Sequence, residues 1–143
     1  MIDKSKEFWY GDDLDDIDEY LRLFSGDNSI EIRTIKCRLC EEKVLHLIVD
    51  PDEDVIAIKC PKCNETRILL DCAEIWEDSE PKKLDCPICG NDSYTSKVGL
   101  LRRSDGNVRH VYVGERCEKC GVLGSCVNWE INYGPTDDLE ANI

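Results

Sequence analysis

The apolar residues of this chain form one helical stripe near the amino terminus, followed by short runs of the β type. The stripe consists of Leu14, Ile17, Leu21 and Phe24. Intervals of 3, 4 and 3 residues place these side chains on one face of a helix. The chain offers Asp12 or Asp13 as a cap for the helix start and Ser25-Gly26 as a stop. The pattern predicts an amphipathic helix that docks through this stripe.

The polar face of the same helix is acidic. Six carboxylates fall within eight residues: Asp12, Asp13, Asp15, Asp16, Asp18 and Glu19. Carboxylates in a first turn suit the positive end of the helix dipole, but this density exceeds what capping requires. Two interpretations stay open, a solvated outer face and a binding surface for a basic partner.

The later apolar runs predict two β-hairpins. Their strands are residues 44–49 and 55–59 in the first hairpin and residues 93–103 and 108–115 in the second. The turns at Asp50–Asp54 and Ser104–Asn107 contain the residue types that favour tight reversal. Further strands are expected at residues 30–35, 66–71 and 122–129.

Four Cys-x-x-Cys pairs carry the chemistry of the sequence. They are Cys37/Cys40, Cys60/Cys63, Cys86/Cys89 and Cys117/Cys120. The two-residue spacing lets both sulfurs reach one ion, and two pairs supply the four thiolates of a structural tetrahedral zinc site. Asn64, Gly90 and Gly121 follow three of the pairs and tolerate the left-handed backbone of such loops, which Glu41 fits least well. The sequence therefore predicts two bound Zn²⁺ ions.

Disulfides, a redox pair and iron are the other uses weighed for these cysteines. The charged first ten residues lack the apolar core of a signal peptide, so a cytoplasmic location is expected, which favours metal over disulfides. No βαβ pattern surrounds any pair, which argues against a thioredoxin-like motif. The segment Cys86–Gly90 would also suit a rubredoxin-like iron site, and ligand softness does not separate the two metals. Iron remains the alternative to zinc.

A hairpin brings its two ends together, which predicts how the pairs share ions. Site 1 would use Cys37, Cys40, Cys60 and Cys63, and site 2 would use Cys86, Cys89, Cys117 and Cys120. The expected fold is a small, metal-bound, mainly β protein of two tandem zinc ribbons, each a three-stranded sheet, preceded by the acidic helix. The expected segments are a helical region 1–29, ribbon one 30–78, a linker 79–84, ribbon two 85–131 and an acidic tail 132–143. Such small ribbons depend on metal for stability, so removing zinc should unfold both.

Charge narrows the choice of partner. The chain has 31 acidic and 18 basic residues, a formal net charge of −13. Nucleic-acid-binding proteins need a basic footprint to displace counterions, so this balance favours a basic partner protein. The alternative is a nucleic-acid-binding accessory factor in transcription or RNA processing. Its support is a basic cluster in ribbon two: Lys97, Arg102, Arg103, Arg109 and Arg116.

Other function classes find little support in the sequence. Both predicted sites use all their ligand positions for cysteine, so neither leaves a position for water or substrate. No nucleophile with a base, phosphate loop or carboxylate pair stands out, so we expect a non-enzyme without a small-molecule substrate. No membrane-spanning segment is present in the sequence. The aromatic triplet Phe8–Tyr10 is expected to pack on the protein body, with a partner-binding anchor as the alternative.

Ribbon two resembles a known family in its motif. Cys86-Pro87-x-Cys89-Gly90, a long hairpin, Cys117-x-x-Cys120-Gly121 and then Trp129 are similar to the zinc ribbons of the Lar-like restriction-alleviation proteins. This resemblance covers about a third of the chain and implies a protein that acts through protein contacts. The acidic character also resembles that of immunity proteins that neutralise basic nuclease toxins. Together these likenesses imply an immunity or antitoxin-type inhibitor or modulator of a nuclease or toxin.

Overall fold

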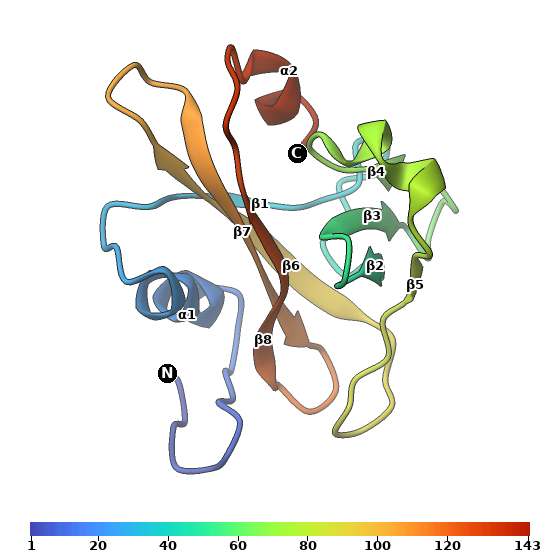
Figure 1. The fold of residues 1–143 in the computed structure, drawn as a ribbon. Coiled ribbons are helices and arrows are strands. Elements are labelled where there is room, and N and C mark those ends of the chain that lie inside the picture. The colour runs from blue at the N-terminus through green and yellow to red at the C-terminus, as the bar shows by residue number, and fades with distance from the viewer.

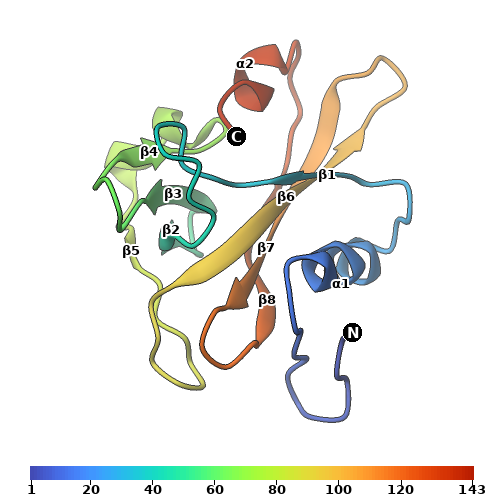
Figure 2. The ribbon, with the colours of Figure 1, turned by 180° about the vertical axis from the view of Figure 1, so that it is seen from behind.

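The protein is a mainly β structure in which two four-stranded antiparallel sheets and two four-cysteine clusters share one core. The computed structural model describes all 143 residues. The larger sheet has the order β1-β6-β7-β8 and the smaller has the order β4-β3-β2-β5. Helix α1 lies on one side of the larger sheet and the smaller sheet lies on the other (Figures 1 and 2).

The elements follow one another from an amino-terminal helix to a short carboxy-terminal one. They are α1 (Asp15–Ser25), β1 (Glu31–Thr34), β2 (His46–Asp50), β3 (Val55–Lys59), β4 (Thr66–Ile68), the 3-10 turns η1 (Cys72–Glu74) and η2 (Trp76–Asp78), β5 (Lys82–Lys83), β6 (Tyr94–Arg102), β7 (Val108–Cys117), β8 (Leu123–Glu130) and α2 (Asp137–Glu140). The two predicted hairpins are β2–β3 and β6–β7, each an antiparallel pair.

Helix α1 is bound to the larger sheet by its apolar stripe. Ile17 and Leu21 are fully buried, and they form a separate small core with Ile2 and Leu123. A glycine of β7 lets the helix approach the sheet: a Cβ on Gly114 would lie 2.9 Å from Leu21 and 3.0 Å from Ile17. Phe24, the last residue of the expected stripe, remains 47% exposed.

The helix begins three residues later than the earliest expected cap. Its N-cap is Leu14, which makes no side-chain hydrogen bond. The Asp13 carboxylate instead accepts the N–H of Asp15 at 2.9 Å, and the Asp16 carboxylate accepts the N–H of Asp12 at 2.7 Å. The carboxylates of Asp13 and Asp16 therefore satisfy two backbone N–H groups at the start of the helix and just before it. The predicted stop is present, with Gly26 in the left-handed conformation at φ 73°.

The strand expected to lead into ribbon one belongs to the other sheet. β1 pairs with β6 over all four of its residues, Ile32 lying opposite Gly99. The side chain of Ile30 occupies the space over Gly99, where an added Cβ would lie 2.5 Å from it. β1 thereby covers an edge of β6 that would otherwise expose unpaired backbone groups, and it continues the apolar surface under α1.

Both sheets are four-stranded rather than three-stranded. The smaller sheet gains β5, which pairs with β2 and lies within the segment expected as a linker. A single cluster of 24 buried residues joins the two sheets, with Leu47 and Ile56 from the smaller and Val98 and Val111 from the larger. The smaller sheet thus packs against the larger one instead of enclosing a core of its own.

The carboxy-terminal segment, expected as an acidic tail, is anchored to the body. Leu139 is buried in the shared core. Glu140 forms ion pairs with Arg102 of β6 at 2.6 Å and with Arg33 of β1 at 3.0 Å. The Arg102 hydrogen bond lowers the pKa of the Glu140 carboxyl, so this pair adds to stability above the usual glutamate pKa, and that contribution is lost as the pH falls through the lowered one.

We predict that Leu21→Ala costs about 2–5 kcal/mol of unfolding free energy, because it leaves a cavity between α1 and the sheet. Leu23→Ala, two positions away and 46% exposed, is the matched control and should change stability by no more than about 0.5 kcal/mol. Urea denaturation of the metal-loaded chain measures both. Equal effects at the two positions would contradict the docking of α1 through its stripe.

Candidate metal centres

All four Cys-x-x-Cys loops have the same backbone geometry. In the first, the N–H of Glu41 donates to the carbonyl of Cys37 at 3.0 Å, and the N–H of Cys37 donates to the carbonyl of Glu42 at 2.9 Å. The same two bonds recur in the other three loops, at 2.7–3.0 Å. This repetition shows that each pair is a knuckle with its own hydrogen-bond pattern, independent of the strand that follows.

The residue after each second cysteine is left-handed in every loop. Its φ is 62° at Glu41, 62° at Asn64, 78° at Gly90 and 83° at Gly121. Glycine and asparagine adopt this conformation at small cost, whereas glutamate does not. The first loop therefore reaches the same geometry with the residue type least suited to it.

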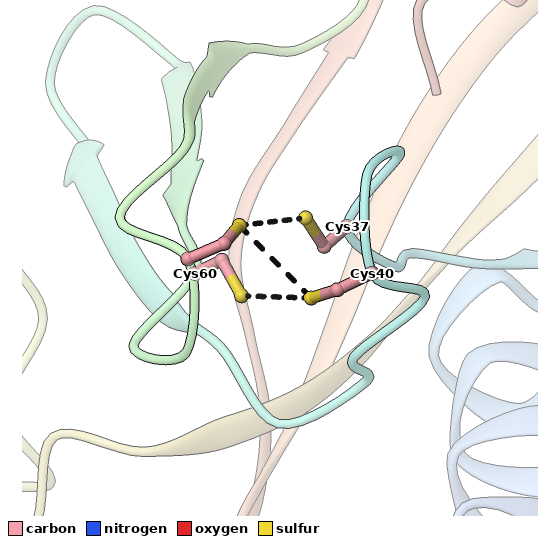
Figure 3. A group of neighbouring side chains, drawn as sticks. Cys37, Cys40 and Cys60 are labelled. Atoms are coloured by element: carbon pink, nitrogen blue, oxygen red, sulfur yellow. Dashed lines mark hydrogen bonds between the residues drawn. The ribbon is translucent and has the colours of Figure 1, made fainter.

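The first cluster brings together the sulfurs of Cys37, Cys40, Cys60 and Cys63. Its Sγ–Sγ distances include 3.5 Å between Cys37 and Cys63, 3.5 Å between Cys40 and Cys60, and 4.0 Å between Cys40 and Cys63. Figure 3 shows the side chains of Cys37 and Cys40 pointing toward the separate loop that carries Cys60, where the sulfur of Cys40 meets that of Cys60. A tetrahedral ion with metal–sulfur bonds of about 2.3 Å requires sulfurs about 3.8 Å apart, so this cluster has the size of a four-cysteine metal site.

The second cluster consists of Cys86, Cys89, Cys117 and Cys120. Its Sγ–Sγ distances include 3.6 Å between Cys86 and Cys120 and 3.6 Å between Cys89 and Cys117. All ten cysteines of the chain are free, and a disulfide would need sulfurs about 2.05 Å apart. The structure therefore groups the eight sulfurs as the hairpins imply, in two clusters that can each hold a metal ion.

The two clusters differ in exposure. Cys40 and Cys63 of the first are exposed, although Cys37 and Cys60 are buried. In the second, Cys86 and Cys117 are buried and the other two ligands are half-buried. The first cluster thus has two of its four ligands open to solvent, whereas no ligand of the second is exposed.

Backbone N–H groups prepare one thiol in each cluster for metal binding. The N–H of Cys40, helped by that of Leu39, lowers the pKa of Cys37 to about 7. Burial opposes ionisation of Cys117, but the N–H groups of Cys120 and Lys119 outweigh it and lower its pKa to about 6. Thiolates rather than thiols bind metals, so these two cysteines are nearest the ligand form at neutral pH, whereas burial and neighbouring thiols raise the pKa of Cys63 and Cys120 to about 12. The N–H donors of the knuckles are therefore part of the sites.

The all-cysteine ligand sets define what these sites can do. Four thiolates fill every position of a tetrahedral ion, which leaves none for water or substrate and is the pattern of structural sites. Soft thiolates suit zinc and also iron. The two remaining cysteines lie outside both clusters: Cys72 is buried, which raises the pKa of its thiol to about 12, and Cys126 lies in β8. His46 and His110 contact Asp92 and Asn128, not the clusters.

Of the six carboxylates at α1, two make part-buried polar contacts within the chain, whereas the hydrogen bond that Asp13 accepts is exposed. Asp16 is buried, and its carboxylate accepts hydrogen bonds from the N–H of Asp12 and from the amino terminus at 3.0 Å. Although burial opposes ionisation, these bonds lower the pKa of Asp16. Asp18 forms an ion pair with the buried Lys97 of β6. Both side chains therefore stabilise the contact between the amino-terminal region and the sheet.

The other four carboxylates, Asp12, Asp13, Asp15 and Glu19, are exposed. Asp12 lies 3.2 Å from the amino-terminal nitrogen with 82% of its side chain exposed, and Glu19 lies 4.0 Å from Lys4. Exposed pairs of this kind contribute little, so these carboxylates remain available to a partner. We call these four residues the acidic face.

Most of the predicted basic cluster serves the chain itself. Arg102 is paired with Glu140 and Glu31, and Arg103 donates to the carbonyl of Tyr133 at 2.6 Å. Arg116 donates to the carbonyl of Gly11 at 2.8 Å and pairs with Glu118. Lys97 is used by Asp18, which leaves Arg109 as the one member with no hydrogen bond or ion pair. Most side chains of the basic cluster are thus engaged within the chain and, unlike the acidic face, are not available to a partner.

Sequence reasoning missed one buried polar group that lies outside both clusters. Glu115 of β7 is buried beside the irregular pairing of β7 with β8, where its carboxylate accepts the N–H of Cys126 at 3.1 Å. Burial raises the pKa of Glu115 to about 7. Its place in an alternating strand resembled that of any surface residue, so the sequence held no signal for it.

The comparisons add no relative. No protein-family model, curated protein or solved structure matches this chain. The likeness to Lar-like ribbons therefore rests on the cysteine motif alone. None of the helices has the length and apolar character needed to cross a membrane.

We predict that the metal-loaded protein carries two ions per chain and that Cys86→Ser carries one. The serine removes one of four ligands and leaves the first cluster unchanged. Cys72→Ala, which alters a buried cysteine outside both clusters, is the control and should keep two. Elemental analysis with native mass spectrometry gives the count. Two ions in Cys86→Ser, or one in Cys72→Ala, would refute this assignment.

We also predict that Glu41→Gly raises the unfolding free energy by about 0.5–1 kcal/mol, because glycine removes the strain of a left-handed glutamate. The change also removes a weak exposed pair with Lys36 at 3.4 Å. Lys43→Gly, two residues further on with ordinary φ, is the matched control and should lower stability by a similar amount. Thermal unfolding at fixed metal concentration measures both, and a loss of stability in Glu41→Gly would contradict the argument.

Proposed function

We propose that this chain is a non-catalytic zinc protein that binds a basic partner protein through the acidic face. One observation carries the proposal: the basic side chains of the larger sheet other than Arg109 are used within the chain, whereas Asp12, Asp13, Asp15 and Glu19 are exposed. The field presented to a partner is therefore negative. The two metal centres supply the stable body on which this face is displayed.

Zinc is the proposed occupant of both centres. Four thiolates with no open position are the ligand set of structural zinc sites, and zinc performs no redox chemistry. Cys37, Cys40, Cys60 and Cys63 would hold one ion, and Cys86, Cys89, Cys117 and Cys120 the other. Such sites contribute folding free energy on the order of 10 kcal/mol or more. Iron would give visible absorbance, which separates the two metals in purified protein.

The charge balance supports a protein partner over a nucleic acid. At −13 the chain repels phosphate, and the arginines that would have formed a basic footprint are paired. Opposite fields speed the encounter of an acidic and a basic protein. Nucleases and nucleic-acid-directed toxins have basic surfaces because they must bind phosphate. Such a surface is complementary to the negative charge of this chain. A role as antidote or modulator of such a protein is the form of the proposal that best fits this charge.

We predict that neutralising the acidic face weakens the complex at least tenfold in 50 mM salt. The loss should be smaller in 500 mM salt, because salt at that concentration already screens the attraction between the acidic face and the partner. The variant carries Asp12→Asn, Asp13→Asn, Asp15→Asn and Glu19→Gln. The partner is first captured from the native organism with tagged wild-type chain and purified. Calorimetry then measures the dissociation constants.

The control variant removes the same amount of charge from exposed acids elsewhere, by Asp52→Asn, Glu53→Gln, Glu77→Gln and Asp78→Asn. It should bind nearly as the wild type does. Equal weakening by the two variants would mean that net charge alone acts and that the acidic face is not the binding surface. A captured partner that is itself acidic would overturn the proposed function.

A further inference from the structure

An apolar groove lies at the carboxy-terminal half of α1. It has a volume of about 230 Å³ and is lined mainly by Phe8 and Trp9 of the amino-terminal arm and by Tyr20, Leu23 and Phe24 of α1. Phe8, Leu23 and Phe24 remain 46–47% exposed. A stable monomer gains nothing from placing three large apolar side chains together at its surface, and such patches mark binding sites.

The groove is held open by contacts within the chain. The Trp9 and Tyr20 rings meet edge to face at 6.0 Å, and Tyr20 stacks on Phe24 at 5.9 Å. Phe24 in turn meets Tyr112 of β7 edge to face at 6.0 Å. The Trp9 carbonyl accepts the N–H of Leu123 at 2.8 Å, which ties the arm to β8. A partner would meet a formed surface, so little free energy is spent on ordering it.

The acidic face leads directly into this groove. Asp15, Glu19 and Leu23 follow one another at four-residue intervals, so they form one row along the exposed side of α1. The exposed Glu7 lines the groove on the arm. The cations nearby are Lys4, which lies over the Trp9 ring at 5.2 Å and 4.0 Å from Glu19, and Arg22 of the helix. The surface thus combines an apolar hollow with an acidic rim, made by Glu7, which lines the hollow, and by Asp15 and Glu19 of the helix row that leads to it.

We infer that the groove receives an apolar side chain from a lysine- or arginine-bearing amphipathic segment of the basic partner, an inference that rests on the proposed function. The volume suits one large side chain, since an apolar cavity of about 150 Å³ already holds benzene. The neighbouring basic residues of the segment meet Glu7, Asp15 and Glu19. A buried apolar anchor surrounded by charged contacts is the usual composition of a protein interface.

Charge decides against the other occupants. A second copy of this chain carries the same net charge of −13 and the same acidic rim, and like charges across an interface are costly. Phosphates of nucleic acids and of anionic lipids meet the same repulsion. A basic amphipathic segment gains from both the hollow and its rim.

The probe is a fluorescein-labelled 18-residue peptide of lysine and leucine at helical spacing, titrated with the full metal-loaded chain and followed by fluorescence anisotropy. We expect Leu23→Asn to weaken binding at least tenfold without changing the salt dependence, because it alters the groove and not the rim. Asp15→Asn with Glu19→Gln should reduce the salt dependence instead. Ile75→Asn, at an isoleucine 40% exposed elsewhere on the surface, is the matched control and should bind as wild type does.

A second peptide, with its leucines replaced by serine, locates the contact. If the leucines enter the groove, this change and Leu23→Asn should each cost at least tenfold, and their combination should cost little more than either alone. Thermal unfolding shows that each variant is folded. Unchanged binding by folded Leu23→Asn overturns the inference while leaving the acidic face to its own test with the native partner.

The remaining outcomes identify other occupants, and each overturns the inference. If a peptide with its lysines replaced by glutamine binds as well as the lysine–leucine peptide, the groove takes apolar side chains without selecting for basic ones. Binding of anionic vesicles or of a 20-nucleotide RNA, with no binding of the lysine–leucine peptide at 100 µM, means a lipid or nucleic-acid surface. Self-association that Leu23→Asn abolishes in sedimentation means that a second copy fills the groove.

Discussion

The convergence of eight sulfurs in two groups is the constraint on which this structure depends. Sulfurs within about 4 Å of one another cannot all be thiolates unless a cation neutralises them. Each cluster joins the two ends of a hairpin, so a bound cation would also fix where β2–β3 and β6–β7 begin and end. Cys37, Cys60, Cys86 and Cys117 are at the same time members of the shared core. Metal binding at these clusters would therefore be coupled to the apolar packing of the core.

The larger sheet acts as the common wall of the molecule. Its two faces are used differently along β6, where Val98 contacts the shared core and Lys97 pairs with Asp18 of α1. One strand thus supports the smaller sheet on one side and the helix on the other. The acidic face lies on the helix side of this wall, and the loop of the second cluster is tied to the same amino-terminal region, because the N–H of Gly11 donates to the carbonyl of Gly121 at 2.8 Å.

The local features of this fold were accessible from the sequence, and the distant ones were not. The hairpins, the knuckles and the helix stripe depend on residues close in sequence, so spacing and turn chemistry predict them. The pairing of β1 with β6 and of β5 with β2 joins segments whose register depends on what each must cover, which no local pattern encodes. Asp16 and Asp18 resembled their exposed neighbours for the same reason. Only the position of Lys97 and of the amino terminus shows that they face inward.

Because the two clusters differ in exposure, they would lose metal in a definite order. Small chelators and oxidants reach Cys40 and Cys63 from solvent, whereas no ligand of the second cluster is exposed. An ion in the first cluster would therefore be the faster one to exchange. Under metal scarcity the chain would then pass through a form with metal in the second cluster alone.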